Sequence, residues 1–149
     1  MSKIVEIAKA EIGTTEVPKD SNLTKYGKWF GLQGVAWCGI FVSWCYAMRG
    51  KPLPNIGFKK GFAGCQTAVA YFKKNNRIVL NPNPGDIVFF DWNGDGRYDH
   101  TGIFVEWVQK NVSFHSVEGN TAIGNDSNGG EVMLRKRGLK GVIFVKVFD

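Results

Sequence analysis

Among its three cysteines and two histidines, the chain has one cysteine where a nucleophile is expected. Cys38 follows a loop with three glycines and opens an almost uninterrupted apolar run that extends to Met48. A helix that is apolar on most sides must be buried, so we predict a buried helix that starts at Cys38. The free amides and the dipole at a helix start favour the thiolate, which is the nucleophilic form. Cys38 is therefore a candidate nucleophile, although a thiol packed in the core would give the same pattern.

A cysteine nucleophile needs a general base, and strand geometry separates the two histidines. His100 opens a predicted strand directly after a turn rich in Gly and Asp, where its side chain can reach a site at the edge of the sheet. On the predicted strand that follows, side chains alternate between the two faces. His115 therefore points to the face opposite that of Glu118 and Asn120. Glu118 and Asn120 are thus candidates to orient the His100 ring, unless they are only strand-end polar residues. Asp99 is a rival for the same role.

The elements that must position these residues change in character halfway along the chain. Apolar residues at helical spacing predict helices over 2–12 and 65–75, besides a short helix near 23–29 and the one at Cys38. The second half consists of short β-branched or aromatic runs separated by turn residues. Strands are predicted over 78–80, 86–90, 100–108, 112–117, 131–136 and 141–147. Helices followed by strands indicate an α+β fold, with the N-terminal helices packed on an antiparallel sheet.

Length, charge and hydropathy exclude several classes of protein. The 149 residues suit a single domain over 1–149, and no apolar run is long enough to cross a bilayer. The net charge is +6, but Lys and Arg are scattered and form no basic stripe of the kind that binds nucleic acid. The N-terminus does not resemble a secretory signal. We therefore expect no nucleic-acid partner and no membrane insertion.

The stretch directly before His100 has the spacing of the first part of an EF-hand loop. Oxygen ligands at positions 1, 3, 5 and 9, a backbone carbonyl at 7 and glycine at 6 are features of such calcium loops. Gly102 stands where the final glutamate is expected, and a polar hairpin turn would show similar residues, so both interpretations stay open. Calcium here would set the backbone before His100. The candidate metal ligands are Asp91, Asn93, Asp95, Arg97 and Asp99.

Four separated motifs occur in an order that resembles one known family. They cover residues 34–45, 82–90, 99–103 and 117–121. Together they resemble the CHAP family, the cysteine, histidine-dependent amidohydrolases/peptidases, over roughly Tyr26 to Thr121. The resemblance implies a papain-like fold and cleavage of bacterial peptidoglycan, either at the N-acetylmuramoyl-L-alanine amide or in the peptide cross-bridge. Many relatives are bacteriolytic modules of phage endolysins.

The resemblance also implies a role for each residue of the site. Cys38 would be the nucleophile and His100 the general base, with Glu118 and Asn120 as its orienting groups. His100 would take the thiol proton, the thiolate would attack an amide carbonyl, and water would release the acyl enzyme.

Five further residues are expected to pack in the core or to contribute to the oxyanion site and the substrate groove. Cys45 and Cys65 are expected to pack in the core. Gln33, five residues before the nucleophile, is a candidate to help the first helical amide hold the oxyanion, or else a solvated loop residue. Trp37 and Trp92 are candidates to line the substrate groove, or else packing residues.

These interpretations describe a monomeric hydrolase whose partner is peptidoglycan and which needs no organic cofactor. We expect a phage lysin that is made in the host cytoplasm and acts on the cell wall, or a protein secreted by another route. We find no separate wall-binding domain after the motifs in this sequence, so we expect wall binding to come from the module itself or from a part outside this chain. Two alternatives stay open, a non-catalytic wall-binding module and an intracellular thiol protease or transferase on the same scaffold.

Overall fold

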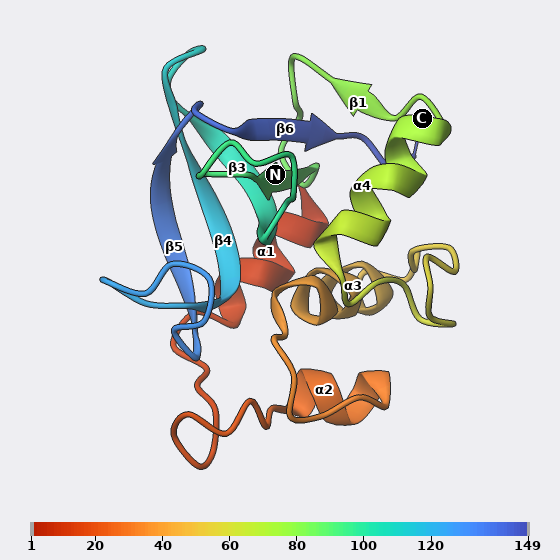
Figure 1. Ribbon diagram of the computed structural model, residues 1–149, viewed down its shortest axis with the longest axis vertical. Helices are drawn as coiled ribbons and strands as arrows, with labels where there is room; N and C mark the ends of the chain where they lie inside the picture. The colour runs from red at the N-terminus through yellow and green to blue at the C-terminus, as the bar shows by residue number, and fades with distance from the viewer. Residues whose placement is uncertain (1, 149) are drawn as a thin grey trace.

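All four helices begin within two residues of the positions that their apolar spacing predicts. The computed structural model describes residues 2–148 (Figure 1). Its helices are α1 (Lys3–Ala10), α2 (Lys25–Phe30), α3 (Cys38–Met48) and α4 (Cys65–Lys74). No helix in these residues combines the length and apolarity needed to cross a membrane.

The second half of the described chain forms one antiparallel sheet, so the α+β prediction is confirmed. The strand order is β1-β6-β2-β3-β4-β5, which places the last strand between the first two. β4 continues four residues beyond its predicted end at Val117, and this brings Glu118 into the sheet. The strands are β1 (Ile78–Val79), β2 (Ile87–Phe90), β3 (His100–Gln109), β4 (Ser113–Thr121), β5 (Glu131–Gly138) and β6 (Val142–Val145).

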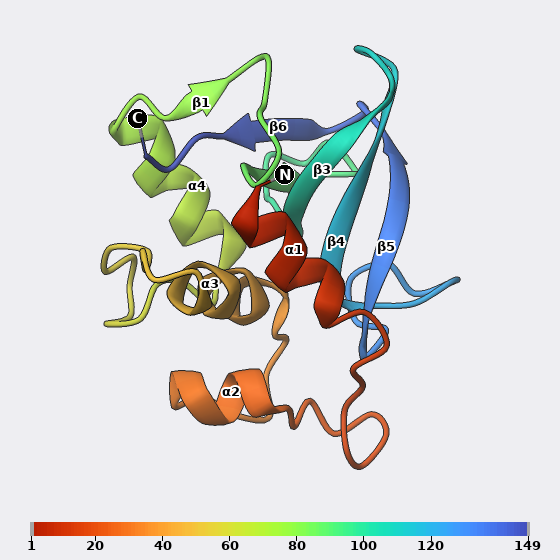
Figure 2. The same cartoon turned by 180° about the vertical axis from the view of Figure 1, so that it is seen from behind.

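The buried helix α3 is the centre of the helical layer. It contacts β3 and β4 of the sheet as well as α1 and α2, which explains why it is apolar on most sides. Both views show α1 and α3 against the sheet, and α2 beyond α3 on the side away from β6 (Figure 1 and Figure 2). A Cβ at Gly119 of β4 would lie 2.7 Å from Phe41 Cβ and 2.9 Å from the Trp37 ring. Glycine at this position therefore lets β4 approach the start of α3.

The sheet is apolar on both faces. Residues such as Ile87, Phe89 and Ile103 pack with the helices. The other face carries an aromatic cluster that includes Phe90 and Phe104. The two faces alternate along β3, so His100 shares a face with Phe104 and not with Ile103.

Candidate active site

Cys38 is the first residue of α3, as predicted, and only 3% of its surface is exposed. The preceding residue, Trp37, is anchored because its indole Nε1 donates a 2.8 Å hydrogen bond to Glu16 Oε2. Trp37 is 1% exposed and packs in the core of the helical layer, which is the alternative that the sequence left open, and its place in a substrate groove stays a prediction. Its role in the fold is to fix the backbone from which Cys38 enters the helix. The backbone amide of Gly39 also acts on the Cys38 sulfur and lowers the pKa of the thiol.

The ring of His100 is fully buried at the start of β3. Its Nε2 lies 2.9 Å from Glu118 Oε1. The ring also interacts with Cys38, and Nε2 is already engaged, so this interaction falls to Nδ1. Nδ1 is buried and makes no hydrogen bond within residues 2–148. The three predicted residues Cys38, His100 and Glu118 are thus brought together.

The proximity of Cys38 and His100 changes the ionisation of both. The hydrogen-bonding contact with Cys65 and the interaction with His100 hold the pKa of the Cys38 thiol well below its ordinary value, against the opposing effect of burial. Burial alone would lower the pKa of His100, but its interactions with Cys38 and Glu118 raise the pKa to about 9. Both shifts favour the thiolate–imidazolium form of the pair over the neutral form.

A glycine in β3 allows Glu118 to reach the histidine. A Cβ at Gly102 would lie 2.6 Å from Glu118 Cγ, so only a residue without a side chain leaves room for the glutamate to lie over β3. Ser116 Oγ donates a further hydrogen bond to Glu118 Oε2. The glycine of the Asp-His-Thr-Gly segment therefore has a steric role at the site.

Arg137 of β5 completes the site and was not singled out from the sequence. Its Nε and Nη2 bind both carboxylate oxygens of Glu118, at 3.0 and 2.6 Å, and its Nη1 lies 2.9 Å from Asp126 Oδ1. Burial raises the pKa of Glu118, but Arg137 and His100 together bring the pKa down to about 2. The carboxylate is therefore ionised at neutral pH.

Aromatic rings cover the histidine on the sheet side. The Trp92 ring stacks on His100 with its centroid 5.6 Å away, and Phe90 lies 5.8 Å from the same ring. The Arg137 guanidinium lies over Trp92, 4.7 Å from the ring centroid. Trp92, a candidate for groove lining or for packing, thus stacks on the catalytic candidate itself.

Asn120 makes no hydrogen bond with His100 among the described residues. Its Oδ1 accepts a hydrogen bond from the amide of Gly130 at 2.9 Å, and its Nδ2 donates to Asn128. The register of β4 shifts after Glu118, and Asn120 has a φ of 60°. Strict alternation, on which the prediction was based, does not continue through such a bulge. Asn120 instead closes the loop between β4 and β5.

The amide of Gln33 is occupied within its own loop. Its Oε1 accepts from the Thr24 amide at 3.2 Å, and its Nε2 donates to the Thr24 carbonyl at 3.0 Å. No contact with Cys38 appears among the described residues, so the role of Gln33 at an oxyanion stays a prediction that no contact supports.

The other two cysteines differ in how close they lie to Cys38. Cys45 is fully buried in the core of the helical layer, as expected. Cys65 is also buried, but its Sγ lies 3.8 Å from Cys38 Sγ, so it is not a packing residue alone. The second histidine, His115, pairs instead with Glu106 and is not part of the group formed by Cys38, His100 and Glu118.

The loop proposed to bind calcium forms turns that its own side chains stabilise. Asp91 Oδ2 accepts from the Gly96 amide at 2.9 Å, and Asp95 Oδ1 accepts from the Arg97 amide at 2.9 Å. Among the described residues Asp91 Oδ1 is buried and has no hydrogen-bond partner, as an oxygen that binds a cation would be. Within residues 2–148, however, no three His, Cys, Asp or Glu side chains are grouped to hold a metal. The loop offers part of an EF-hand ligand set, and calcium stays a prediction.

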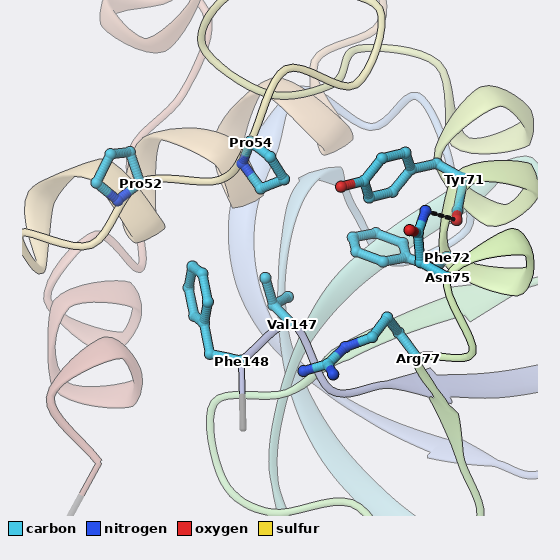
Figure 3. A pocket seen from close by; sticks show the side chains of 8 residues that line it. All are labelled: Pro52, Pro54, Tyr71, Phe72, Asn75, Arg77, Val147 and Phe148. Carbon is cyan, nitrogen blue, oxygen red and sulfur yellow. Dashed lines mark hydrogen bonds between the residues drawn. The ribbon is translucent and has the colours of Figure 1, made fainter.

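A cavity of about 500 Å³ lies at the opposite end of α4 from Cys65 (Figure 3). Its wall is formed by prolines and aromatic residues, including Pro54, Tyr71 and Phe148. It contains no Cys, His, Asp or Glu. This cavity therefore lacks a nucleophile–base pair of the kind that Cys38 and His100 form.

Comparison with known proteins matches the chain to a family and, in fold, to solved structures. The pattern of the CHAP domain matches residues 30–120, which include Cys38, His100 and Glu118. A solved structure of an N-acetylmuramoyl-L-alanine amidase from Staphylococcus aureus has a similar fold, with a TM-score of 0.50 and 11% sequence identity. The similarity covers 78% of this chain and 32% of that chain, so the present chain spans about a third of its length. No protein with a curated description matches the chain.

Proposed function

The chain belongs to the CHAP family, and from this premise we propose that it is a cysteine hydrolase that cleaves an amide bond of bacterial peptidoglycan. The observation that carries the proposal is the contact between Cys38, at the start of a buried helix, and His100, whose second nitrogen is bound by Glu118. A nucleophile, a base and a group that orients the base are the parts that acyl transfer requires.

In the proposed mechanism the nucleophile is already ionised before substrate binds. The Cys38 thiolate attacks the amide carbonyl, and imidazolium Nδ1 of His100 gives its proton to the leaving amine. Neutral His100 then takes a proton from water, which attacks the thioester and releases the carboxylic acid. Cys38 leaves as a thiolate, so the resting thiolate–imidazolium pair is restored.

The surrounding groups position this pair. Glu118 accepts from Nε2, which leaves Nδ1 for the proton transfer and balances the imidazolium charge. The backbone amide of Cys38, at the start of α3, is our candidate donor to the oxyanion. The helix dipole points the same way and favours negative charge there.

The structural neighbour is an N-acetylmuramoyl-L-alanine amidase, and this favours the bond between N-acetylmuramic acid and L-alanine as the scissile bond. Purified peptidoglycan should be digested and the fragments analysed by mass spectrometry. An amidase releases peptides that begin with a free L-alanine amine, whereas an endopeptidase releases muropeptides cut in the cross-bridge. Walls bound but not cut, by wild type and by Cys38→Ala alike, would contradict the proposal and indicate a binding module.

A further inference from the structure

The proposed mechanism does not use Cys65, although its sulfur lies 3.8 Å from that of Cys38. Both thiols are buried, and each is the first residue of a helix, Cys38 of α3 and Cys65 of α4. The two sulfurs are separated by 27 positions in the sequence. Their contact therefore results from the packing of the two helix starts.

The backbone holds these helix starts together. A Cβ at Gly39 would lie 2.8 Å from the Ala63 carbonyl oxygen and 2.7 Å from the Phe62 ring, so glycine at this position permits the approach. Ser43 Oγ donates to the carbonyls of Gly39 and Phe62 and accepts from the Phe62 amide. The segment that leads into Cys65 is thus tied to the helix that begins with Cys38.

We propose that Cys65 is a positioning residue, whose thiol donates a hydrogen bond to the Cys38 thiolate and holds it ionised and aligned for attack. The inference rests on the proposed function in that Cys38 is taken as the nucleophile. A hydrogen bond to an ionised acceptor is stronger than one between neutral groups, so the bond stabilises the thiolate more than the thiol.

The ionisation of Cys65 is consistent with the role of donor. The neighbouring Cys38 and burial raise the pKa of Cys65 well above its ordinary value, and Asp99 acts in the same direction. Cys65 therefore keeps its proton where Cys38 has lost its own. The ionisable groups that act on the pair are His100, on Cys38, and Asp99, on Cys65.

The rate at which iodoacetamide alkylates Cys38, measured against pH and assigned by peptide mapping, tests the inference without any wall substrate. In Cys65→Ala the acid limb of this profile should move up by about one pH unit, because the thiolate loses a donor. Cys65→Ser keeps a donor and should recover at least half of the shift. Cys45→Ala removes another buried thiol of α3 and should leave the limb in place.

An unmoved acid limb in Cys65→Ala, or an equal shift in Cys65→Ser, would overturn the inference, because packing alone would then explain the contact. If Cys65→Ala does not fold, wild-type protein with ¹³Cβ-labelled cysteine replaces it. The Cys65 signal should then stay that of a thiol while Cys38 titrates well below neutral pH, and ionisation of Cys65 in the ordinary thiol range would refute the inference. Normal alkylation profiles with uncut peptidoglycan would instead contradict only the proposed function.

Discussion

Arg137 donates hydrogen bonds to both carboxylate oxygens of Glu118, from Nε to Oε2 at 3.0 Å and from Nη2 to Oε1 at 2.6 Å. The same carboxylate binds His100 Nε2 at 2.9 Å, and His100 interacts with Cys38. Cys38, His100, Glu118 and Arg137 thus form a row across α3, β3, β4 and β5, in which the ionised form of each group faces a group of opposite charge. Buried charges persist only when they are paired in this way.

Arg137→Met should therefore lower both activity and stability. It leaves a buried carboxylate without its cation, which typically costs about 3 kcal/mol of the free energy of unfolding. We expect the melting temperature to fall by roughly 10 °C and kcat to fall by about tenfold or more. Calorimetry and the rate of peptide release from purified walls measure the two effects.

Arg135→Met is the matched control, since Arg135 also binds Asp126 but has no hydrogen bond to Glu118 among the described residues. It should keep most of the activity. Equal losses of activity in the two variants would mean that the rate depends on the charge of the loop around Asp126 and not on the hydrogen bonds from Arg137 to Glu118.

Replacement of the nucleophile should abolish turnover and spare the fold. Cys38→Ala and His100→Ala each remove one reacting group, and we expect activity to fall by about a thousandfold or more. Cys45→Ala should retain turnover, because Cys45 lies in the core away from the pair. Circular dichroism checks the fold, and residual activity of Cys38→Ala above one tenth of wild type would exclude Cys38 as the nucleophile.

The pH profile of kcat/KM should be a broad bell that reports the charged pair. The active form needs Cys38 ionised and His100 protonated, so activity rises as pH passes the lowered pKa of Cys38. Activity falls again as pH passes the raised pKa of His100, about 9. Glu118→Gln weakens the support of the imidazolium and should move the alkaline limb to lower pH. An alkaline limb near the ordinary histidine pKa of about 6.5 in wild type would rule out this arrangement.

Removal of divalent cations tests the loop before His100. If Asp91 Oδ1 binds calcium, a chelator should lower activity and melting temperature, and calcium but not magnesium should restore both. Asp91→Asn should lose the response of the melting temperature to calcium. A protein indifferent to chelator and to added calcium would have a plain hairpin turn at this position.

Much of this site follows from local rules. The apolar run after a glycine-rich loop predicts a buried helix that begins at Cys38, and the structure has it. Alternation along β4 predicts that Glu118 and His115 face opposite ways, and they do so because the strand is regular up to Glu118. The same rule fails for Asn120, because the register shift after Glu118 changes the direction of the following side chains.

By itself, the amino-acid sequence determined the α+β class, the helix that presents the thiol, and the histidine and glutamate at strand positions, since each depends on spacing along one element. Only the tertiary structure decided that Cys65 lies 3.8 Å from Cys38, that Arg137 binds Glu118 and that Trp37 is buried. These contacts join separate elements, and their geometry depends on how closely backbones pack at Gly39, Gly102 and Gly119. Periodicity within a helix or a strand carries no information about that distance.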